Sequence, residues 1–236
     1  MAEILYVCVR PERGAADAEH ASFRRGLGVE ELDRLDLVTT PLTEDVLDRH
    51  TGFVIGGSPF NVTDAVTSPL QQRVEADLER IAERAASGVA SAFFTCFGIG
   101  VVTRMLGGEL TLAHAESTRA AEIRTTDAAA SDPIFGPSAP ALRVFTAHKE
   151  SARRTPPGAT LLATNDDCPV QAYRVGNRLY AAQFHPEPSP RDFADRMTFY
   201  RNNGYFAADE FDRVSGEVLA ARVDGATLLR RFAGLV

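Results

Sequence analysis

The clearest structural signal in this chain lies in Val89-Ala-Ser-Ala-Phe-Phe-Thr-Cys-Phe-Gly-Ile-Gly100. An apolar run ends at Cys96, and the next residues recur at the spacing of one helix face: Val101, Val102, Met105 and Leu106. The pattern predicts that Cys96 lies where a buried strand turns sharply into a helix, at the carboxyl edge of a sheet. The helix N-terminus would stabilise a thiolate at that point. A lone cysteine there is equally typical of an apolar core filler.

Length and composition limit the classes of protein to consider. The 236 residues suffice for one domain with its own core, and we expect a single domain over residues 1–236. The net charge of -7, without a dense Lys/Arg cluster, argues against a nucleic-acid partner. No apolar run reaches the length of a membrane span. Three widely separated cysteines do not indicate a disulfide framework, and we expect a cytoplasmic protein.

The first half of the chain alternates predicted strands and helices. Strands are expected at Glu3–Val9, Leu35–Thr39 and Gly52–Gly56. Ser68-Pro69 begins an amphipathic helix, with serine as cap and proline at the first helical position. This alternation implies crossover connections and a mostly parallel sheet with helices on both faces.

The second half has shorter β-like runs and a helical end. Gly176-Asn177 separates two of these runs as a two-residue hairpin turn, which predicts antiparallel strands at the edge of the sheet. Ser189-Pro190 begins another helix. We expect the C-terminal helices to cover the core rather than carry chemistry.

A histidine and a carboxylate follow the last predicted strand as His185-Pro-Glu187. Residues two apart in an extended segment point to the same side, so the two side chains can meet. A carboxylate on one ring nitrogen fixes the tautomer and leaves the other nitrogen to take a proton from a thiol. The order of nucleophile, base and orienting acid follows the logic of a catalytic triad.

Gly56-Gly57 ends another predicted strand. Acyl transfer requires backbone N–H groups directed at a developing oxyanion. The residue after the nucleophile, Phe97, can supply one N–H, and Gly57 can supply the other because no side chain blocks its approach. Taken by itself, the stretch is more simply explained as a Gly-Gly-Ser-Pro turn.

Taken together, these segments resemble the glutamine-hydrolysing domain of class I, triad-type glutamine amidotransferases, and most of all its stand-alone, GMP-synthase-like members. The resemblance covers nearly the whole chain and rests on Val54-Ile-Gly-Gly-Ser-Pro59, Cys96-Phe-Gly98, Ala147-His-Lys149, Cys168-Pro-Val-Gln171 and Ala182-Gln-Phe-His-Pro-Glu187. It implies a flavodoxin-like α/β fold of three layers.

The resemblance also implies a role for each matching residue. Cys96 would be the nucleophile, His185 the general acid and base, and Glu187 its orienting carboxylate, with Gly57 and Phe97 at the oxyanion. Residues Gly100, His148 and Lys149 would line the substrate pocket. The substrate would be glutamine or another γ-glutamyl compound, and released ammonia would pass to a synthetase in trans. We predict no cofactor and no metal site, because neither a phosphate-binding loop nor zinc-ligand spacing is present.

Two positions depart from the family pattern. Phe94 stands two residues before the cysteine, where the family usually has a glycine, and its bulk argues against an ideal elbow geometry. Gly100 replaces a glutamine that contacts substrate, and we expect it to open space beside the scissile bond. A stand-alone γ-glutamyl peptide or amide hydrolase is therefore one alternative, and a catalytically weak regulatory or binding homologue is another. His148 is a rival base, disfavoured because no carboxylate stands at a suitable spacing, and Lys149 is either a substrate contact or a surface residue.

Overall fold

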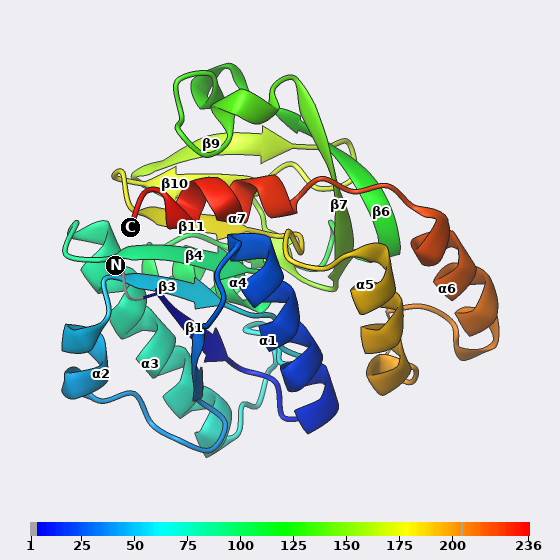
Figure 1. Ribbon diagram of the computed structural model, residues 1–236, viewed down its shortest axis with the longest axis horizontal. Coiled ribbons are helices and arrows are strands. Elements are labelled where there is room, and N and C mark those ends of the chain that lie inside the picture. The colour runs from blue at the N-terminus through cyan, green and yellow to red at the C-terminus, as the bar shows by residue number, and fades with distance from the viewer. Residues whose placement is uncertain (1–3, 204) are drawn as a thin grey trace.

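The computed structural model describes residues 4–203 and 205–236, so Glu3 of the first predicted strand lies outside the described part. One sheet of nine strands dominates it (Figure 1). Five neighbouring strands are mutually parallel, in the spatial order β2 (Asp33–Asp36), β1 (Ile4–Cys8), β3 (Gly52–Ile55), β4 (Ser91–Thr95) and β11 (Leu179–Ala182).

The sheet continues beyond β11 with antiparallel pairings. The added strands are β10 (Ala172–Val175), β9 (Ala159–Thr164), β6 (Glu116–Thr125) and β7 (Ala141–His148). Seven of these nine described strands run in one direction. A separate two-stranded ribbon pairs β5 (Leu110–Thr111) with β8 (Ser151–Ala152).

Helices cover both faces of the sheet and complete three layers (Figure 1). On one face, α1 (Arg13–Leu27) and α7 (Ala226–Ala233) bury Phe23, Leu229 and Phe232 against the strands. On the other face lie α2 (Glu44–Arg49), α3 (Pro69–Ala86) and α4 (Phe97–Met105). The predicted α/β fold, with its mostly parallel sheet and antiparallel edge strands, is confirmed.

The remaining helices lie to one side of the sheet. A smaller apolar cluster joins α5 (Pro190–Met197) and α6 (Phe211–Ala220) to β7 through Phe145, Phe193 and Val218. The described residues also form the short 3₁₀ turns η1 (Asp127–Ala129), η2 (Gly136–Ser138), η3 (Thr198–Tyr200) and η4 (Ala208–Glu210). None of the described helices is both long and apolar enough to cross a membrane.

Local sequence signals explain most boundaries. The Ser68 and Ser189 side chains cap α3 and α5, each followed by proline. The hairpin between β10 and β11 is present, but its loop has three residues, 176–178, and not the predicted two, because Val175 pairs with Leu179. The strand expected at Leu35–Thr39 instead occupies Asp33–Asp36. Pairing with the buried β1 sets that register, and a short strand with charged residues gives little periodic signal of its own.

Candidate active site

Cys96 lies at the turn between β4 and α4, where its N–H donates to the Ala182 carbonyl at 2.9 Å. Its backbone angles are φ 51° and ψ -106°, and it is the one non-glycine residue with positive φ in the described chain. Such strained conformations concentrate at functional sites, and the strand-to-helix elbow of hydrolases is one example. The Phe94 ring packs over Gly98, where an added Cβ would be 2.9 Å from Cδ1, so this large side chain is accommodated beside the turn.

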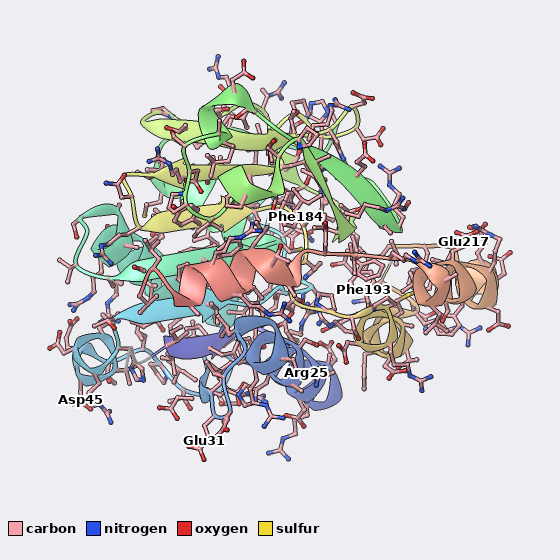
Figure 2. All side chains as sticks on the ribbon, turned by 45° about the horizontal axis from the view of Figure 1, so that its top comes forward. Arg25, Glu31, Asp45, Phe184, Phe193 and Glu217 are labelled. Atoms are coloured by element: carbon pink, nitrogen blue, oxygen red, sulfur yellow. The ribbon has the colours of Figure 1, made fainter. Side chains whose placement is uncertain are left out.

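His185 and Glu187 follow β11 and meet as the sequence predicts. The imidazole Nδ1 is 3.1 Å from Glu187 Oε1, and both side chains are buried. A backbone bond from the His185 N–H to the Phe145 carbonyl, 2.9 Å long, fixes the segment against β7. The ring also packs on Phe193 of α5, labelled in Figure 2, with centroids 5.8 Å apart.

The charges around the imidazole favour its protonated form. Burial by itself lowers the pKa of His185, but the carboxylate of Glu187 and the sulfur of Cys96 outweigh burial and raise the pKa to about 9. Burial raises the pKa of Glu187, yet His185 and Arg196 hold it well below its usual range. At neutral pH the pair is therefore an imidazolium against a carboxylate.

The segments that carry Gly57, Cys96 and His185 converge at Gly57, as a Cβ atom built at this glycine shows. A Cβ there would be 2.8 Å from His185 Cε1, 2.8 Å from Arg10 Nη2 and 3.5 Å from Cys96 Cβ. Cys96 and His185 also line one cavity, together with Arg10, Tyr200, Tyr205 and other residues. A side chain at position 57 would therefore collide with His185 and Arg10 and would touch Cys96.

The two predicted oxyanion donors differ in their surroundings. Phe97 is the first residue of α4, and N–H groups in the first turn of a helix have no intrahelical acceptor. The Gly57 N–H donates instead to Oε1 of the buried Glu19, at 3.2 Å. Gly57 can serve an oxyanion in the predicted way only when that bond is given up.

His148 lies at the end of β7 in a second imidazole–carboxylate pair. Its Nε2 is 2.9 Å from Oε2 of Glu116 on β6, and its Nδ1 is 3.0 Å from the Glu150 carbonyl. The sequence argument that His148 lacks a carboxylate was therefore wrong, because the fold supplies one from a distant strand. Both ring nitrogens are engaged, so neither is free to take a proton from Cys96.

A second cavity beside Cys96 is lined by the His148–Glu150 segment, as expected for these residues. Lys149 places Nζ 5.2 Å from the centroid of the Tyr205 ring, in a cation–π contact. Tyr205 lines both cavities and lies between the two sides of the site.

The expectation that Gly100 opens space was wrong. A Cβ at position 100 would be 3.0 Å from Glu150 Oε1 and 3.2 Å from a Val62 methyl carbon. The Glu150 carboxylate is fixed there, because it accepts the N–H groups of Val62 and Thr63, both at 2.9 Å. A neighbouring side chain thus occupies the volume that a longer residue at position 100 would need.

Sequence reasoning missed three buried charged residues behind the site: Arg10, Glu19 and Arg196. Arg196 belongs to α5 and donates to Glu187 at 2.6 Å, so this C-terminal helix contacts a predicted site residue as well as covering the core. Glu19 lies on the buried face of α1, beside Ala15, Ala16 and Phe23. The thin apolar face of that helix was the available signal, because a buried carboxylate takes the place of an apolar side chain.

Potential ligand atoms gather in two buried groups of the described chain, each within 4.8 Å: Glu19, His185 and Glu187 in one, and Glu116, His148 and Cys168 in the other. The carboxylates and imidazoles of both groups already bond to protein partners. The first group adjoins a cysteine with a strained backbone, an arrangement suited to nucleophilic acyl transfer.

Comparison with known proteins gives three similarities. The family model of class-I glutamine amidotransferases matches residues 29–202. One subunit of the glutamine-hydrolysing GMP synthase of Methanothermobacter thermautotrophicus is 29% identical over 150 residues, which are 63% of this chain and 72% of that protein. Gamma-glutamyl peptidase 3 of Arabidopsis thaliana is 28% identical over 151 residues, which are 61% of this chain and 57% of that protein.

Solved structures agree on the fold. A glutamine amidotransferase from Thermotoga maritima superposes with a TM-score of 0.73 at 16% identity, and the match covers 99% of both chains. A glutamine amidotransferase from Methylobacillus flagellatus gives 0.72 at 14% identity, over 98% of this chain and 94% of that one.

Proposed function

Because this chain belongs to the class-I glutamine amidotransferase family, we propose that it hydrolyses the γ-amide of glutamine and releases glutamate and ammonia. The convergence of Cys96, His185 and Glu187 at the elbow carries the proposal. The raised pKa of His185 supports it, because an imidazolium beside a thiolate is the reactive form of such a pair.

In the first half-reaction the Cys96 thiolate attacks the γ-carbonyl carbon of glutamine. The carbonyl oxygen becomes an oxyanion that the Phe97 N–H can stabilise at the helix N-terminus. The His185 imidazolium gives its Nε2 proton to the amide nitrogen, the C–N bond breaks, and ammonia leaves. A γ-glutamyl thioester remains on Cys96.

In the second half-reaction water attacks the thioester. Neutral His185 takes a proton from the water, a second tetrahedral intermediate collapses, and glutamate leaves as the thiolate is restored. Glu187 holds the Nδ1–H throughout and so keeps the imidazole in the orientation that presents Nε2 to the sulfur.

Two other predicted residues are assigned to substrate binding. We propose that His148 and Lys149 lie along the α-amino and α-carboxylate end of the substrate, and the cavity that they share with Cys96 supports this. We also propose that residues 1–236 act as one domain. The relatives that are subunits of GMP synthases support transfer of ammonia to a separate synthetase partner.

Incubation of the purified protein with glutamine tests the proposal. We expect equimolar glutamate and ammonia, together with a γ-glutamyl adduct on Cys96 in mass spectra of the acid-quenched reaction. Ammonia release that persists in Cys96→Ala, or an adduct on another residue, would remove Cys96 from the mechanism.

A γ-glutamyl peptide or amide hydrolase is the second candidate. The similarity to gamma-glutamyl peptidase 3 favours it, whereas the filled space beside Gly100 removes its original sequence argument. A panel of γ-glutamyl amides with leaving amines of increasing size separates the two candidates. A kcat/KM that is highest for glutamine supports the first, and one that rises with the size of the amine supports the second.

A further inference from the structure

Glu19 stands at the centre of a buried group of charges next to the triad. Its side chain has no exposed surface, although carboxylates are rarely buried without partners. Oε1 accepts from Arg10 Nη2 at 2.7 Å, from Arg196 Nη1 at 3.1 Å and from the Gly57 N–H at 3.2 Å. Oε2 accepts from the Tyr6 hydroxyl at 2.7 Å.

One guanidinium nitrogen joins this group to the triad. Arg196 Nη1, which donates to Glu19, also donates to Glu187 Oε1 at 2.6 Å, and Glu187 holds His185 at 3.1 Å. Oxygen atoms of the two carboxylates and a ring nitrogen of His185 all lie within 4.8 Å of one another. Arg196 therefore links Glu19 directly to Glu187, the orienting carboxylate of the triad.

The Gly56-Gly57 pair fits around the same carboxylate. A Cβ at Gly56 would lie 2.0 Å from Glu19 Oε2, and one at Gly57 would meet His185 and Arg10 at 2.8 Å. The first glycine thus admits Glu19, and the second leaves the space before Cys96 open. The Gly-Gly sequence is therefore required by the site and not only by a turn.

Two arginines keep the neighbouring carboxylates ionised. Burial raises the pKa of Glu19, and Glu187 raises it further, but Arg10 and Arg196 outweigh both and lower it. Removing the charge of Glu19 would leave two buried guanidinium groups with fewer anions beside His185. The titratable and charged groups that face Glu19 from the surrounding elements include Tyr6, Cys8, Arg10, His185, Glu187, Arg196 and Tyr200.

We propose that Glu19 is a positioning residue of the acyl centre, which holds the Gly57 peptide directly and the Glu187–His185 pair through Arg196. The inference rests on the proposed function in so far as Cys96 and His185 are the reacting groups. Glu19 and Arg10 precede residue 29, where the family match begins. Glu19 and Arg10 therefore lie outside the region that the family model matches, whereas Arg196, which joins Glu19 to Glu187, lies inside it.

Asp77 of α3 provides a matched control. It is also a buried carboxylate, and it accepts from Arg73 at 3.2 Å, from Arg80 at 3.1 Å and from the Leu42 N–H at 3.1 Å. It is not among the described residues that line either cavity at Cys96. Glu19→Gln and Asp77→Asn each remove one charge and keep a similar shape, so both test the loss of a buried ion pair.

The test measures kcat and KM for ammonia release from glutamine, the rate of Cys96 alkylation by iodoacetamide against pH, and Tm. We expect Glu19→Gln to lower kcat by about 10- to 100-fold with little change in KM, because the reacting groups lose their alignment. The alkylation inflection that reports His185 should move to lower pH by about one unit, since an anion near the imidazolium is lost. Asp77→Asn should lower Tm and leave both kinetic measurements unchanged.

Each of three results would overturn the proposal. Equal behaviour of Glu19→Gln and Asp77→Asn, with only Tm lowered, would reduce Glu19 to a structural residue. A higher kcat in Glu19→Gln would mean that the carboxylate withholds the Gly57 N–H from the oxyanion. If Glu19→Gln does not fold, Glu19→Asp keeps the charge but withdraws it by one methylene, and an unchanged kcat and alkylation profile would likewise refute the proposal.

The alkylation measurement needs no substrate, so it tests the positioning role of Glu19 separately from the proposed hydrolysis of glutamine. Wild-type protein that is inert toward glutamine would refute the proposed function. A shifted alkylation profile in Glu19→Gln would still support the positioning role in that case, and an unshifted one would refute it.

Discussion

His185–Glu187 and His148–Glu116 are two buried imidazole–carboxylate pairs of similar length, 3.1 and 2.9 Å, and they differ in what the second ring nitrogen meets. In the first pair only Nδ1 is held by the carboxylate, and the ring faces the cavity that contains Cys96. In the second pair the Glu150 carbonyl occupies the other nitrogen. A carboxylate partner is thus insufficient for proton transfer, which also requires a free ring nitrogen directed at the reacting atom.

The largest expected effect comes from removing the sulfur that distinguishes the first pair. Cys96→Ala should lower glutamine turnover by at least about 10⁴-fold, because Cys96 supplies the only thiol among the described residues that line the cavity. It should also lower the pKa of His185, since the Cys96 side chain contributes to raising it. Turnover assays and an NMR titration of the imidazoles check both points, and a shift of similar size at His148 would remove the difference between the two pairs.

Glu187→Gln should have the next largest effect. Loss of the orienting charge should lower kcat by about 10²- to 10⁴-fold, as expected when the imidazole loses its fixed tautomer. Steady-state kinetics of a variant with an unchanged circular dichroism spectrum provides the measurement. A kcat close to that of wild type would remove the first pair from the mechanism.

The pH dependence provides a third test, with a clear sign. The protonated imidazole of His185 is stabilised by Glu187 and Cys96, so it persists as pH rises to about 9 and is lost above that value. Because ammonia must leave with a proton from this ring, kcat for glutamine should fall as pH rises through about 9. A decline centred near pH 6.5, the ordinary value for histidine, would show that the ring is not held as an imidazolium.

Glu116→Gln should have the smallest effect on turnover, within about three-fold of wild type if His148 has no part in proton transfer. Burial raises the pKa of Glu116, but hydrogen bonds from His148, Asn165 and Arg119 outweigh burial and lower this pKa to about 2. Replacement of this carboxylate should cost about 1–3 kcal/mol of unfolding free energy. Urea denaturation and turnover assays measure the two effects, and a loss of kcat as large as that of Glu187→Gln would make the pairs equivalent.

Contacts between residues close together in the sequence could be predicted, and contacts between residues of distant strands could not. His185 and Glu187 are two apart on an extended segment, so their meeting followed from strand geometry alone. Glu116 and His148 meet because β6 and β7 pair, although 32 positions separate them. No local pattern carries that pairing, and the argument from spacing therefore failed for His148.

Gly100 and Phe94, the two departures from the family pattern, both show that the effect of a residue on local space could not be predicted from its size. Position 100 has no side chain, yet its neighbourhood is filled by Glu150, whose carboxylate is fixed by the backbone of residues 62 and 63. Phe94 is bulky, yet Gly98 leaves space for its ring beside the elbow. Whether a substitution opens or closes space depends on its three-dimensional neighbours.

Local sequence alone specified the alternation of strands and helices, the strand-to-helix turn at Cys96 and the His185-Pro-Glu187 unit, because these depend on periodicity and on contacts within a few residues. The gathering of Arg10, Glu19 and Arg196 behind the triad, from the end of β1, α1 and α5, emerged only from the assembled fold. Buried charges are stable only when their counter-charges are supplied, and here those come from segments up to 177 positions apart.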